Sequence, residues 1–332
     1  MTYPVLNQSH PLASGMVGAW FPGYGGANCP DATGTWLPVT TQSLCAAGPL
    51  VGNAFGPAMA FDGLTQGLYA TGAGMPISGA SQFTLAAVAS QFAVGHEFGM
   101  MIYAGTLAAS SAPRCNLDFT ISGSPSTVAF RQNDTGFSTE SAAQPTPIPV
   151  SVAVGLFDRS TGAFSLYVNG ALVQTRTGGP TGAPSFDSLG IAVRPSIYPV
   201  QTGCVVTSGS NIVTASASNT LEDVVIGGLI TDTAGVIAAG TFCTDYDNGR
   251  TVTMSANAIG SSASDTLTFG PPLARLKNGT VNMGVIWNRL LAPAEIASFS
   301  GSPMAPFNIG GGPIGGGVPA GGIFRLKTPA WR

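Results

Sequence analysis

Four acidic residues form the closest carboxylate pairs in the sequence, and paired carboxylates are the groups from which a glycosidase is built. Glu222 and Asp223 are adjacent, and Asp245 and Asp247 are two residues apart, the spacing that places two side chains on one face of a strand. Both sets stand beside turn residues, and "TDYDNG" is explained more simply as the approach to a hairpin. The carboxylate pairs therefore do not predict a hydrolase.

The two histidines, His10 and His96, do not complete any nucleophilic site. His10 precedes a proline, and His96 stands before Glu97 in "VGHEFG"; neither accompanies a Ser or Cys in a recognisable nucleophile elbow. A single His-Glu step is typical of a solvated turn. We therefore expect a protein that is not an enzyme.

Aromatic residues in loops are the side chains that could bind a sugar, because an exposed ring stacks on the sugar face while nearby polar groups hold its hydroxyls. Tyr24 and Trp36 lie in an early Gly/Pro-rich loop, and Tyr69 follows "FDGLTQG". Trp20 and Trp287 fall in apolar strand patterns and are expected in the core. Tyr24, Trp36 and Tyr69 are therefore the candidate glycan-binding residues.

The charge balance excludes a nucleic-acid partner. The chain of 332 residues has a formal net charge of -3, only 8% charged residues, and two lysines, Lys277 and Lys327, so no basic stripe could neutralise a phosphate backbone. A surface so poor in charge fits a protein that packs into an assembly.

No targeting or membrane segment is evident in the sequence. The first residues, "MTYPVLNQSHPLASGMVGAWFPG", lack the basic start and continuous apolar stretch of a secretory signal. Residues 64–95 contain no charge, but Gly, Ser, Thr and Gln interrupt them every few positions. We expect no membrane insertion.

Alternating hydrophobic and polar residues predict a fold built almost entirely of strands. The 46 glycines and 25 prolines supply turns and break helices. One helical turn is predicted at "LAPAEIASF", with Pro293 at its first position and Glu295 in its first turn. The predicted strands are "MVGAWF", "AMAFDG", "FTLAAVAS", "VSVAVGLFD", "FSLYVNG", "SLGIAVR" and "VNMGVIWN". In "FSLYVNG", Asn169-Gly170 predicts a tight hairpin turn.

Three parts are predicted along the chain. Residues 200–274 are richer in Thr, Ser and Val and read as a small β module inserted into a loop of a host sandwich formed by residues 1–199 and 275–300. Residues 301–332 form a Gly/Pro-rich tail. That tail is either disordered or a tether whose tip docks on a partner through Phe324, Arg325, Trp331 and Arg332.

The five cysteines are scattered and form no zinc-binding spacing. Most are expected to be buried thiols of a protein that folds in a reducing compartment. A disulfide between Cys29 and Cys45 across the early loop is the alternative for that pair.

Several motifs together resemble a laminin-G-like or concanavalin A-like domain. They are "HPLASGMVGAWF", "AMAFDGLTQGLYATG", "VSVAVGLFDRSTGAFSLYVNGALVQTRTG" and the closing "GTVNMGVIWNRLLAPAEIASF". The resemblance covers residues 11–299 apart from the insert. It implies an all-β protein whose host is an antiparallel jelly-roll β-sandwich.

The opening and closing motifs also resemble the version of this domain found in tailed-bacteriophage proteins. The insert, with "IAAGTFCTDYDNGRTVTMSANAIGSSASDTLTFG", is similar to a β module of phage head and tail surfaces. This resemblance implies a virion structural protein, made in the host cytoplasm and displayed on the particle surface as a head decoration or fibre protein that contacts other capsid or tail proteins.

The chain departs from the family where a metal would bind. Asn169 replaces the usual Asp of the hairpin tip, and Asn282 and Met283 replace an acidic pair in the last strand. Calcium prefers several oxygen ligands with carboxylates among them. Asp62 and Asp158 remain as weak calcium candidates, and the favoured alternative is that both stabilise turns. No cofactor is expected.

Two functions therefore follow from the sequence. The first is a non-enzymatic component of the virion surface, forming homo-oligomers of which a trimer is favoured. The second is a tail-associated adhesin that recognises a carbohydrate of the host surface. Whether the protein lies on the head or the tail, and whether the insert makes contacts or only projects, stay open.

Overall fold

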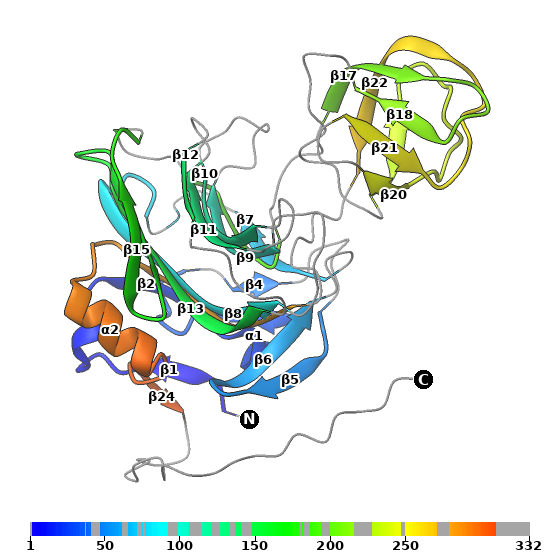
Figure 1. Ribbon diagram of the computed structural model, residues 1–332. Coiled ribbons are helices and arrows are strands. Elements are labelled where there is room, and N and C mark those ends of the chain that lie inside the picture. The colour runs from blue at the N-terminus through cyan, green and yellow to red at the C-terminus, as the bar shows by residue number, and fades with distance from the viewer. Residues whose placement is uncertain are drawn as a thin grey trace.

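The computed structural model is an all-β protein, mostly antiparallel, as the sequence predicts (Figure 1). A β-sandwich of two large sheets carries a short helical layer on one side, and a smaller β unit is formed by the inserted residues. The structure describes residues 2–36, 38–40, 47–61, 66–71, 75, 77–91, 99–105, 114–120, 127–132, 137–140, 148–179, 181, 186–193, 200–215, 228–246, 250–270 and 279–309.

One sheet of the sandwich is covered on both faces, and we call it the inner sheet. Its strands lie in the order β15 (Ala171–Arg176), β14 (Ala163–Val168), β13 (Ile148–Asp158), β8 (Gln82–Gln91), β23 (Gly279–Trp287), β6 (Gly56–Phe61) and β5 (Leu50–Asn53), and β2 (Met16–Trp20) also pairs with β23.

The second large sheet, the outer sheet, packs on one face of the inner sheet. Its eight strands lie in the order β12 (Phe137–Glu140), β11 (Thr127–Gln132), β10 (Arg114–Thr120), β9 (Gly99–Gly105), β16 (Ser188–Ile191), β7 (Leu68–Thr71), β4 (Val39–Thr40) and β3 (Asn28–Cys29). Every pairing in both sheets is antiparallel.

Strand β8 shows how the inner sheet serves two hydrophobic cores. Successive side chains of a strand point to opposite faces. Phe83 and Leu85 belong to the core between the two sheets, whereas Ala86 and Val88 belong to the core on the opposite face. A strand buried on both faces reads as a nearly continuous apolar run, which explains "FTLAAVAS".

The second core is closed by short elements from both ends of the chain. They are β1 (Pro4–Leu6), η1 (Pro11–Ala13), α1 (Pro22–Gly25), α2 (Pro293–Gly301) and β24 (Phe307–Ile309). Strands β1 and β24 pair with each other, so the first and last described segments lie side by side (Figure 1). The predicted helical turn is confirmed as α2, with Pro293 in its first turn and Glu295 two residues later.

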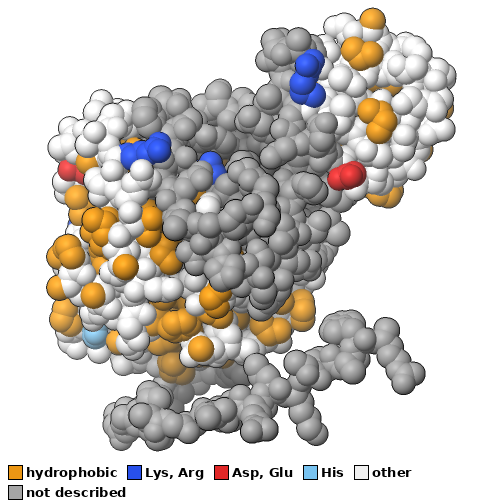
Figure 2. All heavy atoms as spheres, viewed as in Figure 1, with side chains coloured by type: hydrophobic (Ala, Val, Ile, Leu, Met, Phe, Trp, Pro, Cys, Tyr) orange, Lys and Arg blue, Asp and Glu red, His pale blue; other side chains and the backbone are white. Residues whose placement is uncertain are grey.

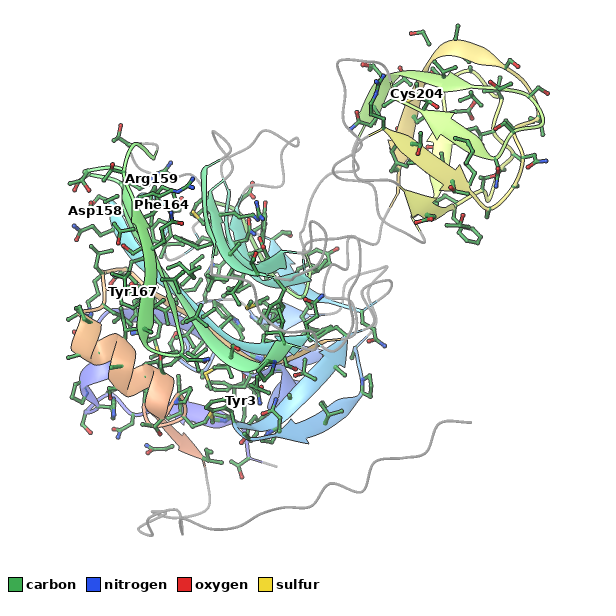
Figure 3. All side chains as sticks on the ribbon, viewed as in Figure 1. Tyr3, Asp158, Arg159, Phe164, Tyr167 and Cys204 are labelled. Carbon is green, nitrogen blue, oxygen red and sulfur yellow. The ribbon has the colours of Figure 1, made fainter. Side chains whose placement is uncertain are left out.

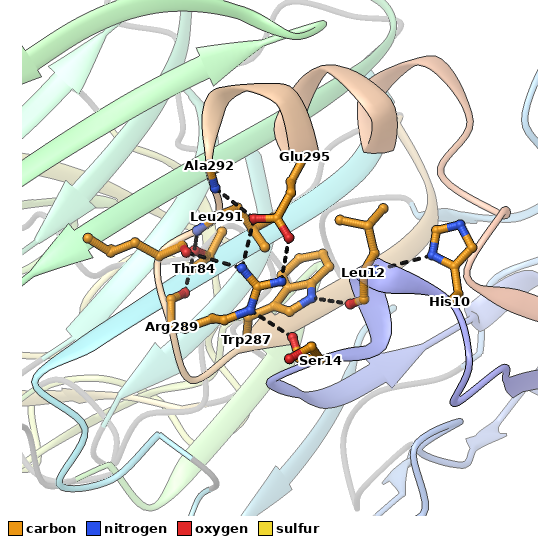
Figure 4. A network of polar contacts seen from close by, with 10 residues as sticks. His10, Leu12, Ser14, Thr84, Trp287, Arg289, Leu291, Ala292 and Glu295 are labelled. Carbon is orange, nitrogen blue, oxygen red and sulfur yellow. Dashed lines mark hydrogen bonds and ion pairs between the residues drawn. The ribbon is translucent and has the colours of Figure 1, made fainter.

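An ion pair fixes the start of α2 (Figure 4). Both amine groups of Arg289 donate to the two carboxylate oxygens of Glu295, at 2.8 and 2.7 Å, and its Nε donates to the carbonyl of Ser14 at 2.8 Å. Glu295 also accepts the backbone N–H of Ala292. These bonds hold the pKa of the Glu295 carboxyl below its usual value. The network therefore ties the end of β23 to both η1 and α2.

The inserted residues form a six-stranded sheet with a hydrophobic core of its own. Its strands lie in the order β19 (Ile230–Asp232), β22 (Ser262–Phe269), β17 (Val200–Val206), β18 (Ile212–Thr214), β21 (Thr251–Met254) and β20 (Cys243–Tyr246). A bridge between Leu229 and Phe242 joins the two end strands, through hydrogen bonds of 2.7 and 2.9 Å. The sheet thus closes on itself, and we call it the insert barrel.

The hairpin turn at Asn169-Gly170 is confirmed. Asn169 has φ 51° and Gly170 has φ 83°, the left-handed conformations that such a turn requires. The Asn169 side chain accepts the N–H of Val152 at 2.9 Å, and a Cβ added to Gly170 would lie 3.4 Å from Ser300 in α2. The hairpin tip is therefore a structural contact with β13 and α2.

Candidate functional site

A row of aromatic and polar residues crosses the outer sheet on the face away from the core. Gly190 in β16 is opposite Tyr69 on one side and Tyr103 on the other. Asn116 is opposite Tyr103, and Arg131 is opposite Asn116. Neighbouring positions on these strands, such as Ile102, Leu117 and Phe130, belong to the core. By strand alternation the row therefore lies on the opposite face, and we call it the outer-sheet row.

Asp118 lies on the same face, two residues beyond Asn116 along β10, and it organises the polar end of the row. Its carboxylate accepts a hydrogen bond from the amide of Asn116 and pairs with Nε of Arg131 at 3.2 Å. Asp118 is fully buried, whereas the Arg131 side chain keeps 21% of its surface exposed. A buried carboxylate is stable only when it is paired and hydrogen-bonded. The carboxylate on the neighbouring strand thus orients the guanidinium of Arg131.

The row is long enough for an extended ligand. Five adjacent strands spaced by about 4.8 Å separate Tyr69 from Arg131 by about 19 Å. Gly190, between Tyr69 and Tyr103, has no side chain and is buried. Tyr103 and Asn116 are almost fully buried, whereas Tyr69 and Arg131 are half-buried. A ligand would therefore meet the row first at its two ends.

The structure places only one of the predicted glycan-binding residues in this row. Tyr69 lies in it, but Trp36 packs edge-on against Trp20 with 5.9 Å between ring centroids, beside the core between the sheets. Tyr24 packs edge-on against Phe21 at 6.2 Å, beside the other core. The three aromatics predicted from the sequence are therefore not one site. Trp20 and Trp287 are fully buried, as predicted.

The loop that carries Trp36 is built around the buried carboxylate of Asp31. Oδ1 accepts the backbone N–H of Ala19 at 2.8 Å and of Thr33 at 3.0 Å. Oδ2 accepts the N–H of Thr35 at 3.0 Å and of Trp36 at 2.9 Å. The hydroxyl of Thr33 also donates to Oδ2, at 2.6 Å. Asp31 thereby joins the loop to β2, and the sequence analysis missed it.

Asp158 stabilises a turn, which is the alternative that the sequence favoured over calcium. It lies at the end of β13 and accepts the N–H of Ser160 at 2.9 Å (Figure 3). Hydrogen bonds from Ser160 lower the pKa of the Asp158 carboxyl. The other calcium candidate, Asp62, lies outside the described residues. Within the described ranges, no group of three or more His, Cys, Asp or Glu side chains could hold a metal ion.

Of the remaining residues considered for catalysis, the structure describes His10 and Asp245, and these two lie in different parts of the fold, one at η1 and one in the insert barrel. The ring of His10 accepts the N–H of Leu12 at 3.2 Å and so caps η1 (Figure 4). Asp245 is an exposed strand residue of the insert barrel. Glu222, Asp223, Asp247, His96 and Glu97 lie outside the described residues, as do the tail residues Phe324, Arg325, Trp331 and Arg332.

The proposed disulfide is wrong for Cys29, which is a free, buried thiol. Its Sγ lies 3.3 Å from the hydroxyl of Tyr3, which also accepts the N–H of Phe21 at 3.1 Å (Figure 3). Burial raises the pKa of this thiol to about 12. Cys45 is outside the described residues, and Cys115, Cys204 and Cys243 are buried thiols, as expected.

Four residues of the site were not found by sequence reasoning: Tyr103, Asn116, Asp118 and Arg131. The signal that could have found them is the alternation in "RCNLDFT" and "TVAFRQ", where Asn116, Asp118 and Arg131 are the polar members of otherwise apolar strands. Period-2 patterning predicts two strands with one polar face each. It does not tell which strands are neighbours, so the row itself needs the register.

The surface seen in Figure 2 shows few charged side chains among the described residues, in line with the low charge content of the sequence. In the parts of the chain that the structure describes, no helix has the length and apolar character needed to cross a membrane.

No family model and no curated protein matches this sequence. Among solved structures, the chain is similar to domain 4 of AbnA, an extracellular arabinanase of Geobacillus stearothermophilus, solved with arabinotriose: 10% identity, TM-score 0.45, covering 86% of this chain and 98% of that one. It is also similar to Trypanosoma rangeli sialidase, with 12% identity, a TM-score of 0.45 and 92% of this chain covered, although it spans only 36% of the sialidase.

A third likeness is to a heptameric SAP-like pentraxin of Limulus polyphemus, with 10% identity, a TM-score of 0.37 and coverage of 73% of this chain and 80% of the pentraxin. Likenesses at these identities and scores concern the general β-sandwich fold. The ligands named with those proteins belong to them. The sheet order of the chain itself places it among β-sandwich proteins. The candidate site rests on the residues of this chain alone.

Proposed function

We propose that this protein binds carbohydrate without catalysis, on the outer face of the outer sheet. The observation that carries the proposal is the outer-sheet row itself, where Tyr69, Asn116 and Arg131 share one face in register. Carbohydrate sites combine an aromatic ring with a few oriented polar groups, and this row contains both kinds.

Each end of the row has a role in this proposal. Tyr69 offers a partly exposed ring at one end, on which a sugar ring can stack. Arg131 offers guanidinium N–H groups, and its pairing with buried Asp118 fixes their direction in advance. A preorganised donor loses little entropy on binding. Because the middle of the row is buried, carbohydrate would make its contacts at these two ends.

The arrangement of carboxylates supports a binding role. A glycosidase requires two carboxyl groups flanking the scissile bond. Among the side chains that the structure describes, Asp118 is the acid of the row, and it is already engaged by Asn116 and Arg131. We therefore assign the row to recognition.

Binding to a glycan array, followed by titration of the best ligand, tests this proposal. Tyr69→Ala should weaken binding about tenfold, because loss of ring stacking costs about 1 kcal/mol or more. Tyr167→Ala is the matched control, since Tyr167 is a half-buried tyrosine on β14 of the inner sheet. The proposal would be overturned if no glycan on the array bound saturably, or if Tyr69→Ala and Tyr167→Ala lost the same amount of binding affinity.

A place on a phage particle is the more specific interpretation of this binding role. The motifs at both ends of the host sandwich and within the insert support it, together with the charge-poor composition. In that setting the protein is a surface component, and carbohydrate recognition makes it an adhesin for the host surface. Immunogold labelling of purified particles tests this; particles without label would remove the virion interpretation and leave carbohydrate binding standing.

A further inference from the structure

One face of the insert barrel carries apolar side chains around a carboxylate. Across β18, β21 and β20, Ile212 is opposite Thr253, and Thr253 is opposite Asp245. Phe242 lies directly before β20, the strand that contains Asp245. Its partner in the bridge that closes the barrel is Leu229. We call these five residues the barrel face.

The apolar members of this face are open to solvent. Ile212, Leu229 and Phe242 have exposed fractions of 39, 43 and 44%, and Asp245 is exposed as well. Their neighbours in sequence, Val213, Ile230 and Cys243, are buried in the barrel core, so the exposed side chains point outward. Figure 2 shows hydrophobic and acidic side chains on the surface of this unit. Contiguous exposed apolar side chains of this kind mark an interaction surface.

The barrel and the C-terminal segment have opposite charge. Residues 200–269 contain six acidic residues and one basic residue, a formal charge of -5, whereas residues 310–332 contain three basic residues and no acid. The segment Phe324-Arg325-Leu326-Lys327 alternates apolar and basic side chains. Its apolar and basic groups thus match the composition of the barrel face.

We propose that the C-terminal segment, residues 323–332, docks on the barrel face of a neighbouring copy of this chain. Phe324 and Leu326 would cover Phe242 and Leu229, and Lys327 would pair with Asp245. Contacts of complementary charge bring partners together and fix their register.

A neighbouring copy, and not the same chain, is the occupant for a geometric reason. The described chain ends at Ile309 in β24, on the α2 side of the host sandwich, whereas the barrel lies beyond the opposite side (Figure 1). Glycine-rich chain such as residues 310–322 spans about 20 Å on average. Passing around the stacked layers of the host would consume that span. Each copy therefore gives a tail and receives one, a head-to-tail contact that builds rings or filaments.

Sedimentation of the full chain over a range of concentrations tests the proposal. The native chain should assemble, and Asp245→Lys and Phe242→Ser should each shift assembly to at least tenfold higher concentration. Ile259→Ser is the matched control, because Ile259 is 67% exposed on the same barrel but outside the barrel face. It should assemble as the native chain does.

A charge exchange separates docking from damage to the fold. In the double variant Asp245→Lys with Lys327→Asp, every copy carries both changes, so the pair is restored with reversed charge and assembly should recover. A native chain that stays monomeric at all concentrations would overturn the proposal. So would assembly that is unchanged by Asp245→Lys and Phe242→Ser.

Discussion

Replacing Asp31 with alanine should lower the free energy of unfolding by about 3 kcal/mol, because several donors lose their acceptor at once. The carboxylate accepts the backbone N–H groups of Ala19, Thr33, Thr35 and Trp36. Ala19 is fully buried, so water cannot replace the carboxylate there. Chemical denaturation followed by intrinsic fluorescence measures the loss, and it also reports on Trp36 and its neighbour Trp20.

Two further variants separate this role from a general effect of losing an acid. Asp31→Asn keeps an oxygen for Ala19 and Thr33 but places an amide donor against the N–H groups of Thr35 and Trp36, so it should also destabilise. Asp158→Ala removes a turn carboxylate that accepts hydrogen bonds from the backbone and hydroxyl of Ser160, and should cost about 1 kcal/mol or less. If Asp31→Ala and Asp158→Ala lowered the free energy of unfolding by the same amount, the special structural role of Asp31 would be contradicted.

Replacing Trp287 with alanine should cost about 3 to 5 kcal/mol, the range for truncating a large buried aromatic residue. Trp287 is fully buried at the end of β23 and packs edge-on against Phe299 of α2, with 5.3 Å between ring centroids. Its indole N–H donates to the carbonyl of Leu12 at 2.8 Å. The substitution therefore leaves a cavity and an unpaired carbonyl where β23, η1 and α2 meet.

Two variants test whether the cavity accounts for most of this loss. Trp287→Phe keeps most of the volume and loses the hydrogen bond, so it should cost only about 1 to 2 kcal/mol. Leu172→Ala removes a side chain that is 55% exposed on the edge strand β15, and should change stability by less than about 0.5 kcal/mol. Denaturant midpoints compare the three proteins directly. If Trp287→Ala lowered the free energy of unfolding no more than Leu172→Ala does, the role of Trp287 as a core residue would be refuted.

The sequence predicted the strands of the inner sheet well because their patterns are long and strongly apolar. "FTLAAVAS" became β8, "VSVAVGLFD" became β13 and "VNMGVIWN" became β23, each buried on both faces. The strands β9 to β12 of the outer sheet were not predicted. Their patterns are shorter and carry Asn116, Asp118 and Arg131, which weaken an apolar signal without abolishing the strand.

The candidate site was predicted only in part, for a related reason. Tyr69 was identified from its residue type, but the sequence grouped it with Tyr24 and Trp36, which pack beside two different cores. The other members of the row come from β16, β9, β10 and β11: Gly190, the direct partner of Tyr69, lies 121 positions along the chain, and Arg131 lies 62 positions along it. Residues this far apart become neighbours only through strand pairing.

Local patterns are enough to predict the all-β class, the helix at Pro293 and the hairpin turn at Asn169-Gly170. These features follow from local physics: hydrophobic period, proline geometry and the left-handed backbone that Asn and Gly accept. The order of the strands, the closure of the insert sheet at Leu229 and Phe242, and the pairing of Asp118 with Arg131 are seen only in the folded structure. Register and sheet order depend on packing between distant segments, which no local pattern encodes.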